Sequence, residues 1–270
     1  MTVLGSPVRH GTVSANGLRL HVADYGGTGE LILLVHGVTG HHAIWNAVAP
    51  ALTTYGHVVA VDMRGHGDSQ WSTEAAYSTA DHASDLVAVA GVIGDPYQTV
   101  TVIGSSWGAL VALAVALEAP DRIARIALVD IEPSFALAPE AVPERPRAFA
   151  SHAEVIAFLR LQHPNASDAL LDVVAANAAR PAAGGLVPKH DPLFFTRWPF
   201  RAENWWPELS RVGASVLVVH AAESFIRRET SEKMAAALPR AVHVEITPST
   251  HVIPVDAPDL LLAELAWWLA

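Results

Sequence analysis

The stretch Val102-Ile103-Gly104-Ser105-Ser106-Trp107-Gly108-Ala109 joins an apolar run, Thr99–Ile103, to a stretch with helical patterning, 107–118. A continuous apolar run of this kind is typical of a strand that is covered on both faces. Where a strand turns tightly into a helix, small residues must stand at the positions where the two elements approach each other. Glycines stand two positions before and two positions after Ser106, whereas isoleucine and tryptophan would flank Ser105. The stretch therefore predicts a sharp strand–turn–helix unit with Ser106 at its tip.

Outward from this unit, apolar runs alternate with helical patterns along most of the chain. An Asn16-Gly17 turn between two short extended stretches also predicts an N-terminal hairpin. Such alternation predicts an α/β fold with a mostly parallel, doubly wound sheet of about eight strands. The expected strands are Thr12–Ala15, 18–25, Leu31–Val35, His57–Val61, Thr99–Ile103, Ile123–Val129, Ser215–Val219 and Ala241–Thr247, and the helical patterns cover about 43–53, 79–93, 107–118, 230–238 and 257–269.

One long segment interrupts this rhythm. Between about Ile131 and Arg211 the sequence has no convincing central strand, and it is rich in proline and in aromatic residues. Compact domains seldom tolerate a structureless loop of this length. The segment 132–211 is therefore predicted to be a helical cap inserted into a core domain made of residues 1–131 and 212–270.

Composition restricts the classes of function. The 270 residues include no cysteine, which excludes disulfides and thiolate chemistry, and the formal net charge of −10 disfavours binding to nucleic acid. The first ten residues lack the basic start and apolar run of a signal peptide. The longest clean apolar stretch, Gly108–Leu117, is too short to span a bilayer. We expect a cytoplasmic protein without a membrane partner, and the sequence does not indicate its oligomeric state.

Three further motifs stand in an order that resembles the capped serine hydrolases of the α/β-hydrolase superfamily. They are Leu34-Val35-His36-Gly37-Val38-Thr39-Gly40, Asp62-Met63-Arg64-Gly65-His66-Gly67-Asp68-Ser69 and Thr250-His251-Val252-Ile253-Pro254. With the turn at Ser106, which matches the nucleophile elbow G-x-S-x-G, the resemblance covers nearly the whole core.

The resemblance implies that Ser106 is the nucleophile and His251 the base that takes its proton. It also implies that the backbone amides of Val38 and Trp107 form an oxyanion hole. His36, Arg64 and His66 are expected to be structural.

The acid of the triad departs from the usual family pattern. Most members carry an aspartate after the strand that follows the cap, and Ser224 occupies that position here. Asp130, at the end of the run Ile126–Asp130, is the preferred acid, because some branches of the family place the acid after this strand. Glu223 is the second candidate and Glu132 the third.

The resemblance favours hydrolysis of a small-to-medium carboxylic ester or lactone, with no cofactor and a small molecule as the only expected partner. An aspartate nucleophile, as in the family's dehalogenases and epoxide hydrolases, is excluded at position 106. No metal-ligand spacing such as His-Glu-x-x-His and no glycine-rich phosphate loop occurs. Cleavage of a carbon–carbon or amide bond by the same triad, or a receptor-like role with little turnover, remain alternatives. Candidate pocket residues are Gly37, His41, Phe194, Trp198 and Trp205.

Overall fold

The protein is described here by a computed structural model that covers residues 8–96 and 98–270. Residues 1–7, on which the expected absence of a signal peptide largely rests, lie outside the described residues. Within the described residues, eight strands form one sheet in the order β1-β2-β4-β3-β5-β6-β9-β10. The strands are β1 (Arg9–Ala15), β2 (Leu18–Gly26), β3 (Leu31–Val35), β4 (His57–Val61), β5 (Val100–Ser105), β6 (Ile123–Val129), β9 (Ser215–Ala221) and β10 (Ala241–Ile246).

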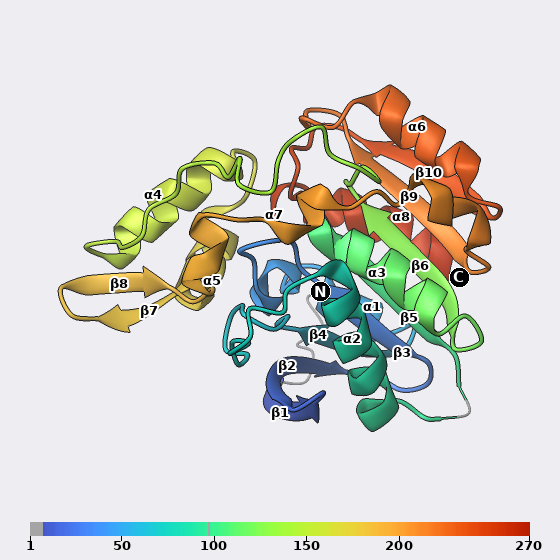
Figure 1. The fold of residues 1–270 in the computed structure, drawn as a ribbon, viewed down its shortest axis with the longest axis horizontal. Helices are drawn as coiled ribbons and strands as arrows, with labels where there is room; N and C mark the ends of the chain where they lie inside the picture. The colour runs from blue at the N-terminus through green and yellow to red at the C-terminus, as the bar shows by residue number, and fades with distance from the viewer. Residues whose placement is uncertain (1–7, 97) are drawn as a thin grey trace, which may run out of the picture.

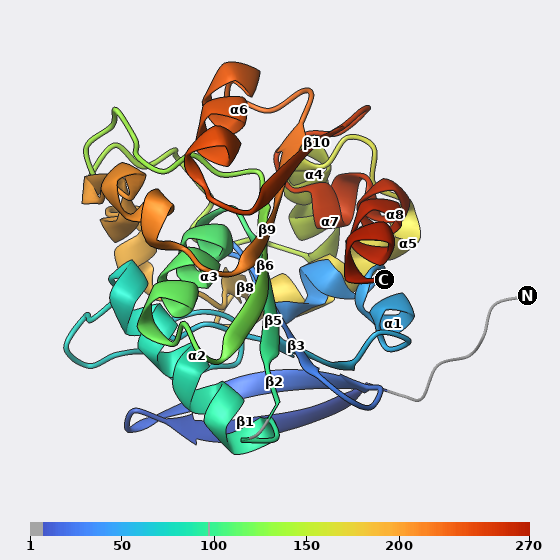
Figure 2. The same ribbon diagram turned by 90° about the vertical axis from the view of Figure 1, so that its right-hand side faces the viewer.

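Helices cover both faces of this sheet, as the sequence predicts for a doubly wound fold. Figure 2 shows α2 (Thr79–Ile93), α3 (Trp107–Glu118) and α6 (Arg228–Ala237) on one side. On the other side lie α1 (Ala49–Leu52), α7 (Ile253–Asp256) and α8 (Pro258–Leu269). The central strands β3 and β5 are buried along their whole length, which is why their sequences are continuous apolar runs.

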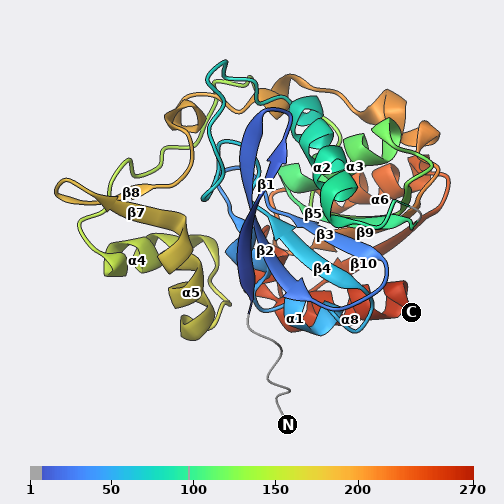
Figure 3. The same cartoon turned by 90° about the horizontal axis from the view of Figure 1, so that it is seen from below.

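The N-terminal strands form the expected hairpin at the edge of the sheet (Figure 3). β1 pairs with β2 in antiparallel fashion, and β2 also pairs with β4 in antiparallel fashion, while the other strand pairs are parallel. Both turn residues have positive φ, 48° at Asn16 and 79° at Gly17. This is the backbone that the type I′ hairpin turn requires, and asparagine and glycine adopt it most readily.

The segment 132–211 lies beside one end of the sheet (Figures 1 and 3), and it is only partly helical. Besides the helices it contains a small antiparallel hairpin, β7–β8, which the expectation of a helical cap did not include. Prolines 181 and 188 are tolerated because a two-stranded ribbon has only edge strands. Its elements are α4 (His152–Gln162), α5 (Asp168–Ala178), β7 (Ala179–Ala182), β8 (Gly185–Pro188) and the 3-10 turns η2 (Pro192–Phe195), η3 (Pro199–Ala202) and η4 (Trp206–Arg211).

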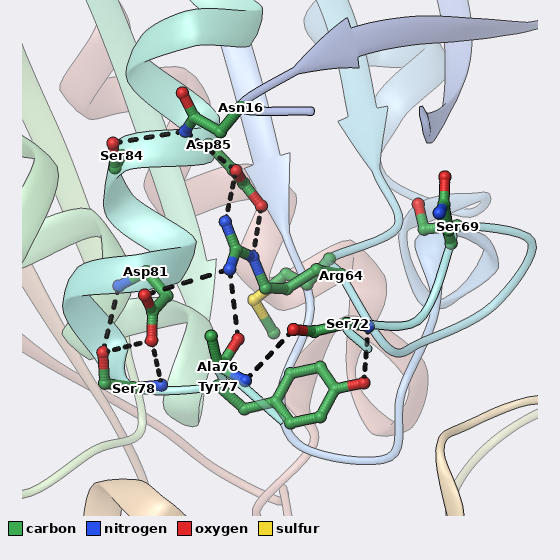
Figure 4. Close-up of polar contacts among 12 residues, drawn as sticks. Asn16, Arg64, Ser69, Ser72, Ala76, Tyr77, Ser78, Asp81, Ser84 and Asp85 are labelled. Atoms are coloured by element: carbon green, nitrogen blue, oxygen red, sulfur yellow. Dashed lines mark hydrogen bonds and ion pairs between the residues drawn. The ribbon is translucent and has the colours of Figure 1, made fainter. Parts of the chain in front are cut away.

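The loop after β4 is fixed to α2 by a buried ion pair, shown in Figure 4. The guanidinium of Arg64 donates from Nε to Asp85 Oδ2 at 2.6 Å and from Nη2 to Asp85 Oδ1 at 2.7 Å. Arg64 Nη1 also donates to the carbonyl oxygen of Ala76 at 3.1 Å. Ser78 caps the N-terminus of α2 and forms a reciprocal capping box with Asp81. These contacts give Arg64 the structural role that the sequence predicts.

In the part of the chain that the structure describes, no helix combines the length and the apolar character needed to cross a bilayer.

Candidate active site

The neighbouring parallel strands β5, β6 and β9 have their carboxyl ends at the same end of the sheet. Ser106 follows β5 and Asp130 follows β6, and each is anchored to the next strand in the sheet. The amide of Ser106 donates to the carbonyl oxygen of Val129 at 2.8 Å, and that of Asp130 donates to the carbonyl oxygen of Val219 at 2.8 Å. The sheet itself therefore sets the separation of the two side chains.

Ser106 sits in a strained turn between β5 and α3. Its φ of 55° and ψ of −126° are unusual for a residue with a side chain. The turn is tight enough that a Cβ on Gly104 would lie 2.0 Å from the carbonyl oxygen of Gly108. A Cβ on Gly108 would lie 2.5 Å from the carbonyl oxygen of Val35. The flanking glycines are thus required for the backbone that holds the Ser106 hydroxyl above the sheet.

His251 connects Ser106 to Asp130. Its Nε2 lies 2.9 Å from Ser106 Oγ, and its Nδ1 lies 2.7 Å from Asp130 Oδ2. An ionised carboxylate only accepts hydrogen bonds, so Nδ1 carries the hydrogen and the neutral ring presents the Nε2 lone pair to the hydroxyl. The side chain of His251 is 22% exposed and that of Asp130 is fully buried. The His251 ring is thus partly exposed, and its carboxylate partner is enclosed.

The Asp130 carboxylate is held by two further donors. Oδ1 accepts from the amide of Ala221 at 2.9 Å, and Oδ2 accepts from the hydroxyl of Ser224 at 2.5 Å. Ser224, which follows β9, thus supports a carboxylate that follows β6. Glu223 is exposed, and burial raises the pKa of the half-buried Glu132. Of the three candidate acids, only Asp130 contacts His251 in the described residues.

The loop that carries His251 is anchored by residues that the sequence analysis did not identify. Asp256 Oδ2 accepts from the amide of Thr250 at 2.8 Å and from the side-chain amide of Asn165 at 2.9 Å. The ring of Phe225, which is exposed, lies 4.5 Å from the imidazole of His251 between centroids. Asn165 and Asp256 are 91 positions apart in the chain, and no sequence pattern relates them.

The loop after β3 lies directly against the Ser106 turn. A Cβ on Gly37 would lie 2.8 Å from Cβ of Ser106, so the loop follows the serine closely. His36 is fully buried, and its Nε2 accepts from the amide of Met63 at 3.0 Å. Burial lowers the pKa of His36 to about 4. His36 therefore holds the loop as a neutral ring, in the structural role expected for it.

The two amides expected to form the oxyanion hole lie in different parts of the fold. Val38 follows Gly37 in the loop after β3, and Trp107 is the first residue of α3. Amides at a helix N-terminus lack partners within the helix and carry the positive end of its dipole. The indole of Trp107 is fully buried, and its Nε1 donates to the hydroxyl of Thr79 in α2 at 2.8 Å. This contact fixes the residue that follows the serine.

The remaining candidate pocket residues are buried or half-buried, so they expose little surface to a substrate. Phe194 is fully buried, Trp198 is nearly so, and Trp205 is half-buried. Phe194 lies 5.9 Å from Trp107 and 4.4 Å from His66 between ring centroids. His41 is buried, and burial lowers its pKa to about 3. Phe194 and Phe200 thus pack against Trp107, and with Trp198 they form part of the core.

A hollow of about 320 Å³ lies beside these elements and is lined by polar residues. It does not contain Ser106, and Glu132 is the one candidate site residue among its walls. Its lining residues are Glu132, Ser134, Trp206, Arg227, Glu229, Thr230 and Lys233.

The sequence matches a known family model and several known proteins. A family model described as "alpha/beta hydrolase fold" matches residues 30–171. N-formylmaleamate deformylase of Pseudomonas putida is 37% identical over 124 residues, which are 46% of this chain and 45% of the deformylase. Epoxide hydrolase A of Mycobacterium tuberculosis is 33% identical over 194 residues, which are 70% of this chain and 58% of that enzyme. The chain thus spans about half the length of these curated relatives.

A solved structure with the same fold covers almost the whole chain. The crystal structure of E-2-(acetamidomethylene)succinate hydrolase superposes with a TM-score of 0.85 at 23% sequence identity. The superposition covers 97% of this chain and 99% of the other. At this identity the likeness concerns the fold alone.

Proposed function

Because the chain belongs to the family with the alpha/beta hydrolase fold, we propose that it is a serine hydrolase that cleaves a small-to-medium carboxylic ester or lactone. The observation that carries the proposal is the unbroken hydrogen-bond chain from Ser106 through His251 to Asp130. Segment 132–211 is proposed to act as the cap over the site, and the contact of Asn165 with Asp256 supports this by joining the segment to the loop of His251. The expected cytoplasmic location stays a prediction.

In the proposed mechanism Ser106 Oγ attacks the carbonyl carbon of the substrate while His251 Nε2 takes its proton. The buried carboxylate of Asp130 stabilises the imidazolium that forms, and it keeps the ring in the required tautomer. The imidazolium then protonates the leaving alkoxide, and an acyl group remains on Ser106. A water molecule, deprotonated by His251, attacks this acyl-enzyme and releases the carboxylic acid and the free serine.

The negative charge that develops on the carbonyl oxygen needs donors that are already in place. The amides of Val38 and Trp107 are the proposed donors, one from each side of the serine. By analogy with a measured side-chain donor, loss of one such hydrogen bond costs about 3–4 kcal/mol in the transition state. The close packing of Gly37 against Ser106 and the buried anchor of Trp107 support their fixed positions.

A second candidate is cleavage of an amide or imide by the same groups. The relative at 37% identity is named as a deformylase of N-formylmaleamate, and this favours testing substrates with N-acyl groups. Several other relatives are named as epoxide hydrolases, but the hydroxyl at position 106 supports acyl transfer instead.

A fluorophosphonate probe tests the proposed nucleophile, and Ser105 provides a matched control. Ser105 is adjacent in sequence but buried, with its hydroxyl unpaired among the described residues. We expect the wild type and Ser105→Ala to be labelled once and Ser106→Ala not to be labelled. A panel of esters, lactones, N-acyl compounds and β-diketones then identifies the bond that is cleaved. A folded wild-type protein that resists labelling would contradict the proposal and favour a receptor-like role.

A further inference from the structure

Three histidines gather outside the candidate active site, where the N-terminal hairpin meets the start of the 3-10 helix η1 (His42–Trp45). His10 lies in β1, His21 in β2, and His42 is the first residue of η1. One ring nitrogen of each lies within 4.8 Å of a ring nitrogen of both others. The three ring centroids are 4.8 to 5.3 Å apart. Each imidazole is therefore within reach of a point between the three rings.

The sheet register fixes two of these histidines. Thr12 lies opposite His21 in the β1–β2 pair, and His10 stands two positions from Thr12 on the same face. His10 and His21 are thus diagonal neighbours, close enough for their side chains to meet. The amide of Asp62, directly after β4, donates to the carbonyl oxygen of His21 at 3.0 Å. The backbone thereby brings the acid beside the histidine pair.

A buried carboxylate orients two of the three rings. Asp62 is fully buried, and its Oδ2 accepts from His21 Nδ1 at 2.8 Å while its Oδ1 accepts from His42 Nδ1 at 3.0 Å. The amides of His42 and Asp68 donate to the same carboxylate at 2.6 and 3.0 Å. Because the carboxylate accepts at both Nδ1 atoms, the neutral rings keep their lone pairs on Nε2. In metal sites, a carboxylate often accepts a hydrogen bond from the ring nitrogen that does not bind the metal, and this contact orients the histidine.

The spacing and exposure of the nitrogens suit a zinc ion. His10 Nδ1 lies 3.1 Å from His21 Nε2. Zn–N bonds of about 2.0–2.1 Å in a tetrahedral site put ligand nitrogens roughly 3.3–3.4 Å apart. His10 is exposed, His21 is half-buried and His42 is buried, so an ion can enter from the surface and keep a water molecule as its fourth ligand. Asp68 is nearby but its carboxylate is paired with Lys189 at 2.8 Å.

We propose that His10, His21 and His42 form a binding site for a divalent transition-metal ion, of which zinc is the representative, with Asp62 as the carboxylate that orients the ligands. The ion joins the edge hairpin to η1, which directly follows the loop packed against Ser106. Because the ion binds only the folded arrangement of these three elements, its binding raises the stability of the native protein. This site is independent of the proposed hydrolase activity.

Calorimetric titration of the untagged, chelator-treated 270-residue chain with Zn²⁺ near neutral pH tests the site. We expect one zinc ion per chain and a rise in melting temperature with zinc. Mg²⁺, which prefers oxygen ligands, should do neither. Co²⁺ provides a readout that needs no variant, because it gives visible d–d absorption when it binds in a tetrahedral site. No zinc binding by the wild type, or binding with no change in melting temperature, would overturn the proposal.

His10→Gln removes the most exposed ligand, and His152→Gln is its matched control. His152 is an exposed histidine of α4 that contacts Asp172 and lies far from this cluster in the chain. We expect His10→Gln to bind zinc about tenfold or more weakly, since even changes behind the ligands cost about 10- to 100-fold in affinity. His152→Gln should bind like the wild type. Equal affinity in His10→Gln and the wild type would show that zinc binds elsewhere.

Discussion

At the scale of single residues, the distribution of negative charge around His251 decides how the candidate site works. Asp130 supplies a fully buried carboxylate at 2.7 Å from the ring, whereas Glu223 is exposed and turned to solvent. The hydroxyl of Ser224 donates to Asp130 and so stabilises its carboxylate. In the proposed mechanism, the charge that balances the imidazolium therefore comes from the end of β6.

Asp130→Asn should lower kcat by about 10³- to 10⁴-fold, because an amide holds the imidazole in the wrong tautomer and cannot balance its charge. Glu223→Gln should keep most of the wild-type activity. Steady-state kinetics on any substrate found in the panel, with circular dichroism to verify folding, measures both. A large loss in Glu223→Gln together with an active Asp130→Asn would show that the acid is Glu223.

The pair of positions 130 and 224 allows a rescue experiment. Ser224 Oγ lies 2.5 Å from the oxygen of Asp130 that contacts His251, so a carboxylate at position 224 comes close to the same ring nitrogen. The double variant Asp130→Asn/Ser224→Asp should recover kcat/KM by about tenfold or more over Asp130→Asn, which corresponds to about 1.4 kcal/mol. Asp130→Asn/Ser224→Asn is the uncharged control. No gain from the aspartate over the asparagine would contradict this geometry.

Much of the candidate site could be predicted because its members follow local rules. The glycines around Ser106 are needed for a turn that the five residues Gly104–Gly108 define, and His251 follows the last strand. The supports of these residues could not be predicted. Ser224 meets Asp130 only because β6 and β9 are neighbours, and Asn165 meets Asp256 across 91 positions. Such contacts depend on tertiary packing and leave no pattern along the chain.

At the scale of elements, the strands and helices of the core follow the sequence more faithfully than segment 132–211 does. Strands with two buried faces need continuous apolar runs, so β3, β5 and β6 were predictable almost to the residue. The hairpin β7–β8 was not, because its strands have only four residues each, include prolines and lie outside the main sheet. Short exposed ribbons bury too little apolar surface to impose an alternating pattern.

The ion pair between the loop after β4 and α2 is an element-scale contact with a measurable energy. Asp85→Ala removes the bidentate partner of the buried Arg64 guanidinium, which keeps only the Ala76 carbonyl and Asp81 at 3.9 Å, and should lower the free energy of unfolding by about 3–5 kcal/mol. Ser84→Ala, one position away on the same helix, removes only a neutral hydrogen bond from Asn16 Nδ2 at 3.2 Å to a half-buried hydroxyl, and should change it by about 1 kcal/mol or less. Urea unfolding followed by circular dichroism distinguishes the two. Equal effects of both variants would mean that the pair contributes no net stability.

At the scale of the whole molecule, the distribution of buried histidines predicts how stability depends on pH. Burial lowers the pKa of His36 to about 4, that of His41 to about 3 and that of His163 to about 4. Burial also holds the pKa values of His66 and His82 well below the usual 6.5. In the unfolded chain all five regain ordinary pKa values. Below pH 6.5 the unfolded state therefore binds protons that the folded state excludes.

The sign of the effect follows from this difference. Stability is full above about pH 6.5 and is lost as the pH falls towards the folded pKa values, because protons favour the state that binds more of them. His36 alone contributes a loss of about 3 kcal/mol between pH 7 and pH 4. The free energy of unfolding of a typical domain is only about 5–15 kcal/mol. Two or three such histidines therefore suffice for unfolding above pH 4. Most carboxylates titrate below about pH 5, so their effect on stability begins at lower pH than that of the histidines.

Urea unfolding at a series of pH values tests this expectation, and His82→Leu tests its origin. Neither ring nitrogen of His82 has a hydrogen-bond partner among the described residues, so leucine removes a titrating group without breaking a hydrogen bond. The free energy of unfolding should be flat from pH 8 to 7 and fall by about 1.4 kcal/mol per pH unit for each buried histidine near pH 5. His82→Leu should reduce this slope by the contribution of one proton, about 1.4 kcal/mol per pH unit. His152→Gln, at an exposed position, should not change it. A free energy that stays constant down to pH 5 would mean that these rings are protonated inside the folded protein.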